Sequence, residues 1–321
     1  MSETSLPRTT ATIQRPAEAN IGRAGRFGLF DLFLFLTVVV GWSTAWYALK
    51  LQLGVMSPMQ SLVLRFGISA ALMWGIAKWN GESLRYAPRD HLYLFLTGAL
   101  LYGVSFGGFY LGQEGLPSGL VSVIFSLASL MNLFLARAFF GERIAPSILL
   151  GGIVGVAGVA ALFSPVFAAA FSGQGGLARG AVASIVIDLG ATLAFCLGNI
   201  AALKAMSLRP AAAALNVWAM GYGTLCFIVA AIAEGQPVTF DGSATFIGSF
   251  LWLTIVSTVV VYWSYTRLSV RIGAARAGYA AVTNPLIALL VSTALEGYEW
   301  TAIGILGLVL VVVGNVIVLR R

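Results

Sequence analysis

Windows of about 20 predominantly apolar residues repeat along almost the whole sequence, and this feature restricts the chain to one class of fold. A window of that length crosses a hydrocarbon core of about 30 Å as an α-helix. Short breaks separate ten such windows, at residues 29–49, 57–79, 91–113, 117–138, 146–166, 179–203, 211–234, 243–267, 275–295 and 300–319. The sequence therefore predicts an all-α integral membrane protein with ten transmembrane helices.

Composition excludes the other classes of protein. Of the 321 residues, 59% are hydrophobic and 10% are charged, whereas a soluble domain carries about 25% charged residues. A membrane barrel would show short segments in which apolar and polar residues alternate. These windows are instead apolar at odd and even positions alike. A disulfide scaffold is excluded because Cys196 and Cys226 are the only cysteines and both lie in apolar windows.

Basic residues predict the orientation of the chain, because Lys and Arg are retained on the cytoplasmic side of a membrane. If the N-terminus is inside, 16 of the 19 Lys and Arg residues fall on the cytoplasmic side, two (Lys50 and Arg179) fall opposite, and Arg65 lies within a window. Both termini are therefore expected in the cytoplasm, with residues 1–26 as a disordered tail. The net charge of +7 is scattered rather than gathered in one stripe, so no nucleic-acid partner is expected.

An internal repeat divides the ten windows into two sets of five. The sequence Ala-Leu-Lys closes the first window of each half at Lys50 and Lys204, and a pair of glycines recurs near the end of each half, at Gly151 and Gly158 and at Gly307 and Gly314. We expect a first repeat at 27–167, a linker at 168–178 and a second repeat at 179–321. Because five is odd, the second repeat is inverted, an architecture of secondary transporters that bind substrate near the midplane.

These motifs give the chain a resemblance to a known family. In order, the sequence shows Gly41-Trp42 with Lys50, Pro58 with Leu64-Arg65-Phe66, Gly141-Glu142-Arg143, the glycines named above and Asn284-Pro285-Leu286. This series resembles the EamA-type members of the drug/metabolite transporter superfamily, which have two inverted five-helix repeats. The chain departs from the family pattern at Ser129, where a proline is usual, and at Tyr298, where the second half would carry a glutamate.

The resemblance implies a secondary transporter that exports small metabolites across the bacterial inner membrane by alternating access. Aromatic content and loop lengths are most similar to the YddG-type exporters of aromatic and other neutral amino acids. Two alternatives stay open: a multidrug or cationic-compound exporter of the same superfamily, and a membrane scaffold that transports nothing. The expected partners are a small-molecule substrate and the lipid bilayer, and the oligomeric state is left open.

Enzyme chemistry finds no support in the sequence. It contains no P-loop, no Cys/His spacing for a metal, no Gly-x-Ser-x-Gly elbow and no His-Glu-x-x-His motif. We therefore expect no catalytic residue, no metal and no cofactor.

Two ionisable residues, Arg65 and Asp188, fall well inside apolar windows. Charges within a bilayer are costly and mark functional candidates. Asp188 could couple transport to protons or bind a substrate ammonium, or it could be a structural partner of Arg65 or of backbone groups. Arg65 could instead tie helices together.

Aromatic and amide side chains deep in the windows are the candidates for a substrate pocket. An aromatic ring with a polar tip seeks a hydrogen-bond partner or a wet cavity when it is buried, although plain helix packing explains many such residues. Pro285 should bend its helix and expose carbonyl groups. The candidate substrate-binding residues are Trp42, Trp46, Tyr102, Tyr110, Asn199, Trp263, Tyr279 and Asn284.

Overall fold

The computed structural model describes residues 28–54, 56–141, 145–171, 176–206, 212–272 and 274–319. Every regular element in these ranges is a helix. The tail predicted at 1–26 lies outside the described residues, as does part of the predicted linker, at 172–175.

The first half of the chain forms five helical spans. In chain order its helices are α1 (Leu29–Lys50), α2 (Pro58–Trp79), α3 (His91–Thr97), η1 (Gly98–Val104), α4 (Ser105–Gly112), α5 (Ser118–Ser126), α6 (Ala128–Phe140) and α7 (Pro146–Phe171). The third span combines α3, η1 and α4, and the fourth combines α5 and α6.

The second half repeats this order. Its helices are α8 (Gly176–Met206), α9 (Ala212–Glu234), α10 (Ala244–Leu251), η2 (Trp252–Val260), α11 (Val261–Ile272), α12 (Ala274–Ala277), α13 (Tyr279–Glu296) and α14 (Ala302–Leu319). Among the described residues, eight spans are long and apolar enough to cross a membrane, and two shorter apolar helices, Val282–Glu296 and Ala302–Val318, follow them. These spans confirm the predicted all-α membrane fold.

Helix ends follow ordinary capping chemistry. The Ser57 hydroxyl accepts a hydrogen bond from the Gln60 N–H at 3.2 Å, and Pro58 supplies a first residue that needs no N–H partner. Gly141 ends α6 and Gly297 ends α13, each with φ of +70°. That left-handed conformation costs a glycine little, so the fourth helix of each half ends in the same way.

A π-helical segment lies at the equivalent place in both halves. It covers η1 (Gly98–Val104) in the first half and η2 (Trp252–Val260) in the second. Each segment begins after a short α-helix and passes directly into the next one. π-Helical turns are rare in proteins as a whole, and those that occur are often found at functional sites. Here both halves of the chain carry one.

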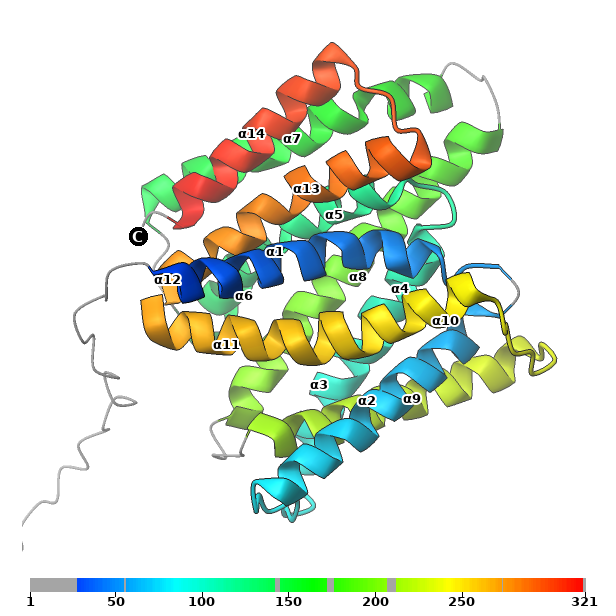
Figure 1. Cartoon of the computed structure of the whole chain (residues 1–321). Coiled ribbons are helices and arrows are strands. Elements are labelled where there is room, and N and C mark those ends of the chain that lie inside the picture. The colour runs from blue at the N-terminus through cyan, green and yellow to red at the C-terminus, as the bar shows by residue number, and fades with distance from the viewer. Residues whose placement is uncertain are drawn as a thin grey trace, which may run out of the picture.

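The two halves pack around an approximate two-fold relationship. A methyl group added at Gly158 would lie 2.6 Å from the carbonyl oxygen of Gly307, and one added at Gly307 would lie 2.6 Å from that of Gly158. Gly151 and Gly314 approach each other in the same way. Helices α7 and α14 are therefore antiparallel and in backbone contact (Figure 1), and the reciprocal pairing is that of a two-fold interface.

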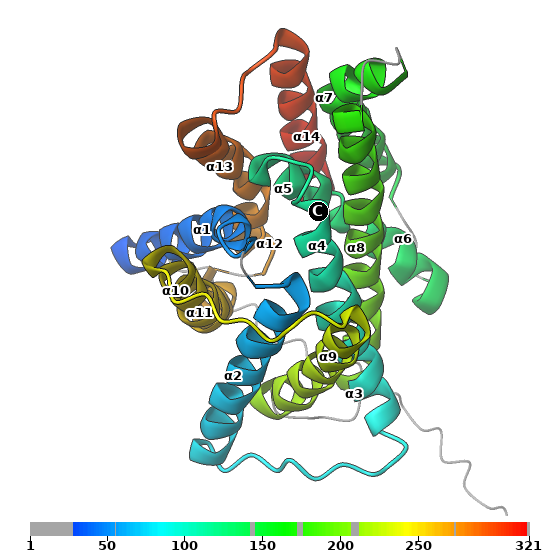
Figure 2. The ribbon, with the colours of Figure 1, turned by 90° about the vertical axis from the view of Figure 1, so that its right-hand side faces the viewer.

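The other helices follow the same symmetry. Helix α2 packs on α9, its equivalent in the second half, while α1 packs between α13 and α11 (Figure 1). In the corresponding position α8 packs on α3, η1 and α4, and on α5 and α6 (Figure 2).

Apolar side chains cover much of the outer surface. Leu150, Ile153, Val229, Ile232 and Leu306 are each more than half exposed. In water such a surface would be unfavourable, whereas hydrocarbon solvates it. The polar groups of interest therefore lie inside the bundle and at its two ends.

Candidate functional site: polar junctions and buried charges in the bundle

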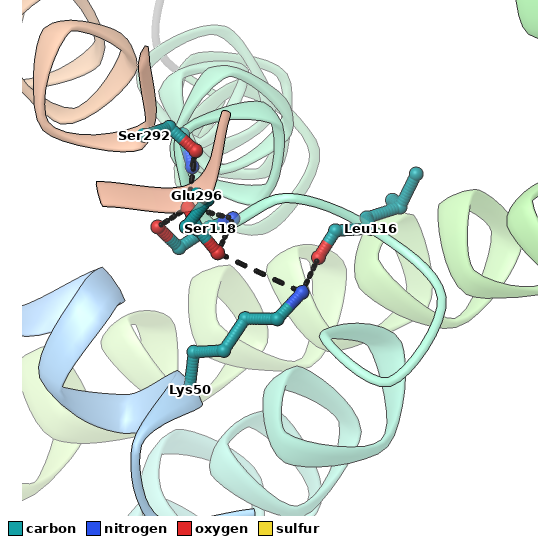
Figure 3. Close-up of polar contacts among 6 residues, drawn as sticks. Lys50, Leu116, Ser118, Ser292 and Glu296 are labelled. Carbon is teal, nitrogen blue, oxygen red and sulfur yellow. Dashed lines mark hydrogen bonds and ion pairs between the residues drawn. The ribbon is translucent and has the colours of Figure 1, made fainter. Parts of the chain in front are cut away.

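Three helices meet at one end of the bundle around the carboxylate of Glu296 (Figure 3). Glu296 is the last residue of α13, Lys50 is the last residue of α1 and Ser118 is the first residue of α5. The Ser118 N–H donates to both carboxylate oxygens, at 3.0 and 3.2 Å, and the Ser118 hydroxyl donates to Oε2 at 2.5 Å. The carboxylate thus caps the N-terminus of α5, where unpaired N–H groups and the helix dipole favour a negative charge.

Further contacts complete what we name the Glu296 junction, formed by Lys50, Leu116, Ser118, Ser292 and Glu296. Lys50 Nζ lies 3.6 Å from Glu296 Oε1 and donates to the Leu116 carbonyl at 2.8 Å. The Ser292 hydroxyl donates to Glu296 Oε2 and accepts a hydrogen bond from the Gly119 N–H. The junction ties α1 and α13 to the start of α5 (Figure 3).

Two glutamines add links at the same end, between the first and second halves. The Gln52 amide donates to the Ser249 hydroxyl at 2.6 Å and to the Phe246 carbonyl at 3.1 Å. The Gln60 amide donates to the Pro237 carbonyl at 3.0 Å and accepts from the Thr239 N–H at 3.2 Å.

The opposite end of the bundle has different links. Asp31 in α1 forms an ion pair with Arg271 in α11. The Glu82 carboxylate accepts from the Ala214 N–H at 2.9 Å, and His91 is hydrogen-bonded to the Tyr222 hydroxyl at 2.8 Å. Burial, and to a smaller extent the Glu82 carboxylate, raises the pKa of Tyr86 in the adjoining loop.

Aromatic side chains form a continuous cluster between the two ends. Trp46 contacts the rings of Phe109 and Phe125, with centroids 5.4 and 5.3 Å apart. The cluster continues through Phe106 to Phe66, which also contacts Phe227 of the second half. The structure thus places the predicted Trp46 in a cluster of rings from both halves. We name this cluster the aromatic wall; it consists of Trp46, Phe66, Phe106, Phe109, Phe125 and Phe227.

Two further predicted residues form hydrogen bonds between helices. The Tyr102 hydroxyl donates to Asn216 Oδ1 at 3.0 Å, and its ring centroid lies 5.2 Å from that of Phe66. Asn199 in α8 donates to Asn132 Oδ1 at 3.4 Å. Both pairs join different helices and present amide groups inside the bundle.

The remaining candidates are more dispersed. Trp42 packs on Tyr265 with centroids 5.1 Å apart. In α13, Tyr279 is half-buried at the first position, Pro285 lies buried inside the helix, and the buried Asn284 has no hydrogen-bond partner at Oδ1.

Trp263 lies apart from the cluster. It is 47% exposed on α11, with the Arg267 guanidinium 4.3 Å from its ring centroid. The structure therefore does not bring Trp263 together with Trp46 and Tyr102.

Arg65 and Tyr110 are buried near each other. Arg65 is 4% exposed and its guanidinium lies 5.3 Å from the Phe66 ring centroid and 5.1 Å from that of Phe106. Tyr110 is fully buried in α4, one turn beyond Phe106. Neither the Tyr110 hydroxyl nor the Nε and Nη1 atoms of Arg65 have a hydrogen-bond partner.

Asp188 occupies a different environment, between α8 and α4. It is fully buried, and neither carboxylate oxygen has a hydrogen-bond partner. A methyl group added at Gly112 would overlap the carboxylate. Arg65 forms none of the ion pairs between described residues, so the structure does not show the pair of Asp188 with Arg65 that is one of the alternatives for Asp188.

Sequence reasoning missed Glu296 and its partner Ser118 as site residues. A signal was available: Glu296 stands 154 residues after Glu142, the same offset that relates Lys50 to Lys204. Within the described residues, no group of three His, Cys, Asp or Glu side chains could hold a metal ion.

Comparisons with known proteins agree with this architecture. Residues 29–172 match the EamA-like transporter family. A probable amino-acid metabolite efflux pump of Salmonella typhimurium strain LT2 is 28% identical over 88% of this chain and 93% of its own length. A protein of the same description from Escherichia coli K12 is also 28% identical, over 88% of this chain and 93% of its own length. A solved crystal structure that is 14% identical covers 91% of this chain and 98% of its own with a TM-score of 0.60, a likeness of fold.

The matched stretch runs from α1 to α7, so the first half of the chain is similar to the EamA-like transporter family. The chain is a multi-pass membrane protein, and the proteins it is similar to are transporters and not enzymes.

Proposed function

We propose that this chain exports neutral and aromatic amino acids across the bacterial inner membrane by alternating access of two inverted repeats, residues 27–167 and 179–321, joined by the linker 168–178. The observation that carries the proposal is the Glu296 junction. There a carboxylate of the second repeat, from α13, caps a helix of the first repeat, α5. A contact of this kind closes one end of the bundle and opens when the repeats separate.

The aromatic wall supports the choice of substrate. Rings of Trp46, Phe66 and Phe109 offer flat apolar surfaces inside the bundle, on which an aromatic or aliphatic side chain can pack. The relatives named amino-acid metabolite efflux pumps support the same class of substrate.

The distribution of Lys and Arg supports cytoplasmic termini, since 16 of the 19 basic residues then lie inside. In that orientation the Glu296 junction faces outward and closes the exit. Helical spans also favour the inner membrane, because bacterial outer-membrane proteins are barrels.

Counterflow in proteoliposomes tests the proposal. Vesicles that contain the full chain are loaded with one unlabelled amino acid at a time, and uptake of labelled phenylalanine is followed with and without a proton gradient. We expect uptake that depends on the internal amino acid. No uptake under either condition would refute amino-acid export, and no flux of any small molecule would favour the scaffold alternative.

Asp188 favours one second candidate, a cationic-compound exporter. Its buried carboxylate without partners is a group that could bind an organic cation or a proton. Asp188→Asn keeps the shape of the side chain and removes the charge. Loss of cation transport in this variant, with phenylalanine counterflow absent from the parent chain, would favour that candidate over the amino-acid exporter.

A further inference from the structure

One face of α2 carries three buried polar side chains in a row. Ser61, Arg65 and Ser69 are spaced by four residues and so share a helix face. They are 0%, 4% and 1% exposed. The Ser61 and Ser69 hydroxyls, like Arg65 Nε and Nη1, have no hydrogen-bond partner.

This face meets a second polar face at the end of the third span. Phe106 and Tyr110 are one turn apart in α4, and Gln113 follows one turn later. The Arg65 guanidinium packs over Phe106, 5.1 Å from its ring centroid, and the Tyr110 side chain is fully buried one turn further along the same helix. Gln113 is fully buried, and both atoms of its amide lack a partner.

Buried polar groups are almost always hydrogen-bonded, so a group of unpaired ones calls for an explanation. The guanidinium keeps its charge at any accessible pH, and a buried charge without a partner is strongly unfavourable. None of the ion pairs between described residues includes Arg65. A ligand that brings a negative charge would remove this cost.

The chemistry of the unpaired atoms specifies the ligand. Six of the seven can donate a hydrogen bond, and Gln113 Oε1 is the exception. Arginine with hydroxyl donors recognises carboxylates and phosphates, and the apolar rings that surround Arg65 favour a carboxylate on an apolar skeleton. Because Arg65 also lies over Phe66, a bound carboxylate would place the rest of the molecule against the aromatic wall.

We propose that Arg65 and Tyr110 bind the carboxylate of the transported molecule, so that the substrates of this chain are apolar or aromatic carboxylates. This inference rests on the proposed export function and assigns the substrate group that the site recognises, which is the carboxylate and not the amine. Ser61 and Ser69 lie one turn to either side of Arg65 on α2, and Gln113 follows Tyr110 by one turn, so these residues flank the proposed site.

Three compounds with one aromatic skeleton test the inference on the full chain in lipid nanodiscs. L-Phenylalanine has both charged groups, 3-phenylpropionate has only the carboxylate, and 2-phenylethylamine has only the amine. We expect the two carboxylates to bind and to compete with labelled phenylalanine, and the amine to bind about tenfold more weakly or not at all, since it leaves the charged donors unpaired. Equal binding of amine and carboxylates, or no binding by any of the three, would overturn the inference.

Two conservative variants test whether Arg65 and Tyr110 bind the carboxylate. Tyr110→Phe removes one hydroxyl, and Arg65→Lys keeps the charge but loses the planar guanidinium. Each should weaken binding of both carboxylates by about fivefold to tenfold without a matching change for the amine. Arg267→Lys, at the exposed arginine on Trp263, is the matched control and should change neither. Unaltered carboxylate affinity in both Arg65 and Tyr110 variants would refute the assignment.

Separate measurements of binding and of counterflow distinguish a failure of the carboxylate site from a failure of the proposed export function. Selective binding of the carboxylates with no counterflow would refute the proposed exporter and leave the binding site standing. Counterflow of 2-phenylethylamine with no effect of 3-phenylpropionate would keep an exporter and refute the carboxylate site.

Discussion

Glu296 is bound more closely to Ser118 than to Lys50. Ser118 approaches the carboxylate with its N–H at 3.0 Å and its hydroxyl at 2.5 Å, whereas the Lys50 ammonium lies 3.6 Å away and its side chain is 33% exposed. A helix N-terminus and a hydroxyl therefore hold the carboxylate, and the lysine adds a weaker, partly solvated attraction. The junction acts chiefly as a cap on α5.

Removing the negative charge should loosen this end of the bundle. Glu296→Gln keeps the size of the side chain but weakens hydrogen bonds to a charged acceptor, each worth about 2 kcal/mol. Ser122 is fully buried one turn further along α5. In a chain without native cysteines, we expect Ser122→Cys to react about tenfold faster with a membrane-impermeant maleimide when Glu296→Gln is present.

Glu299→Gln is the control for that experiment, because Glu299 is exposed and only three residues further on. It should leave the labelling rate unchanged. If Glu296→Gln behaves like this control, the junction does not hold the end closed.

A charge swap separates the cap from the ion pair. Lys50→Glu combined with Glu296→Lys would restore an ion pair, but a lysine cannot accept the hydrogen bonds from Ser118. We expect the double variant to be at least as unstable as Glu296→Gln alone, and Lys50→Met to be milder, with a loss of about 1 kcal/mol. Thermal unfolding of the purified proteins measures both, and recovery in the swapped variant would contradict the cap.

The sequence alone predicts the helices well because their lengths follow from the apolar windows, and starts such as Ser57-Pro58 carry local signals. The Glu296 junction is different, since Ser118 and Glu296 are 178 residues apart and no local pattern links them. Only the repeat offset from Glu142 and Lys50 to their counterparts could have suggested it.

The sequence also does not show which side of a helix faces lipid and which faces the interior of the bundle. In a membrane, side chains that face lipid are as apolar as those that face the core, so hydrophobic periodicity does not separate the two faces of a helix. For this reason Trp46 and Trp263 looked equivalent as candidates, and only the structure distinguishes the clustered ring from the exposed one.

The reciprocal glycine contacts of α7 and α14 predict the same loss of stability for an alanine substitution on either helix. Gly158→Ala and Gly307→Ala each place a methyl group 2.6 Å from the partner's carbonyl oxygen, so each should destabilise the protein by about 2 kcal/mol, as overpacking does. Gly155→Ala is the matched control, because nothing lies within 4 Å of a methyl group there. Thermal unfolding in one detergent compares the three, and a Gly155 variant as unstable as the others would contradict the close packing.

Asp188 and Gly112 should compensate each other. Gly112→Ala introduces a methyl group into the space of the carboxylate and should cost about 2 kcal/mol. In the double variant Gly112→Ala with Asp188→Ala, the new methyl group fills part of the volume that the carboxylate leaves, so we expect a smaller loss than the sum of the single changes. Additive losses in a double-mutant cycle would show that the two residues do not share this space.

Trp46 and Trp263 look alike in the sequence but have different surroundings in the structure. Trp46→Ala removes a ring that contacts Phe109 and Phe125, and we expect the half-saturating concentration of phenylalanine in counterflow to rise about tenfold. Trp263→Ala should leave it unchanged, because Trp263 is 47% exposed and contacts Arg267 on the surface of α11. If the Trp263 variant loses affinity and the Trp46 variant does not, the substrate binds away from the aromatic wall.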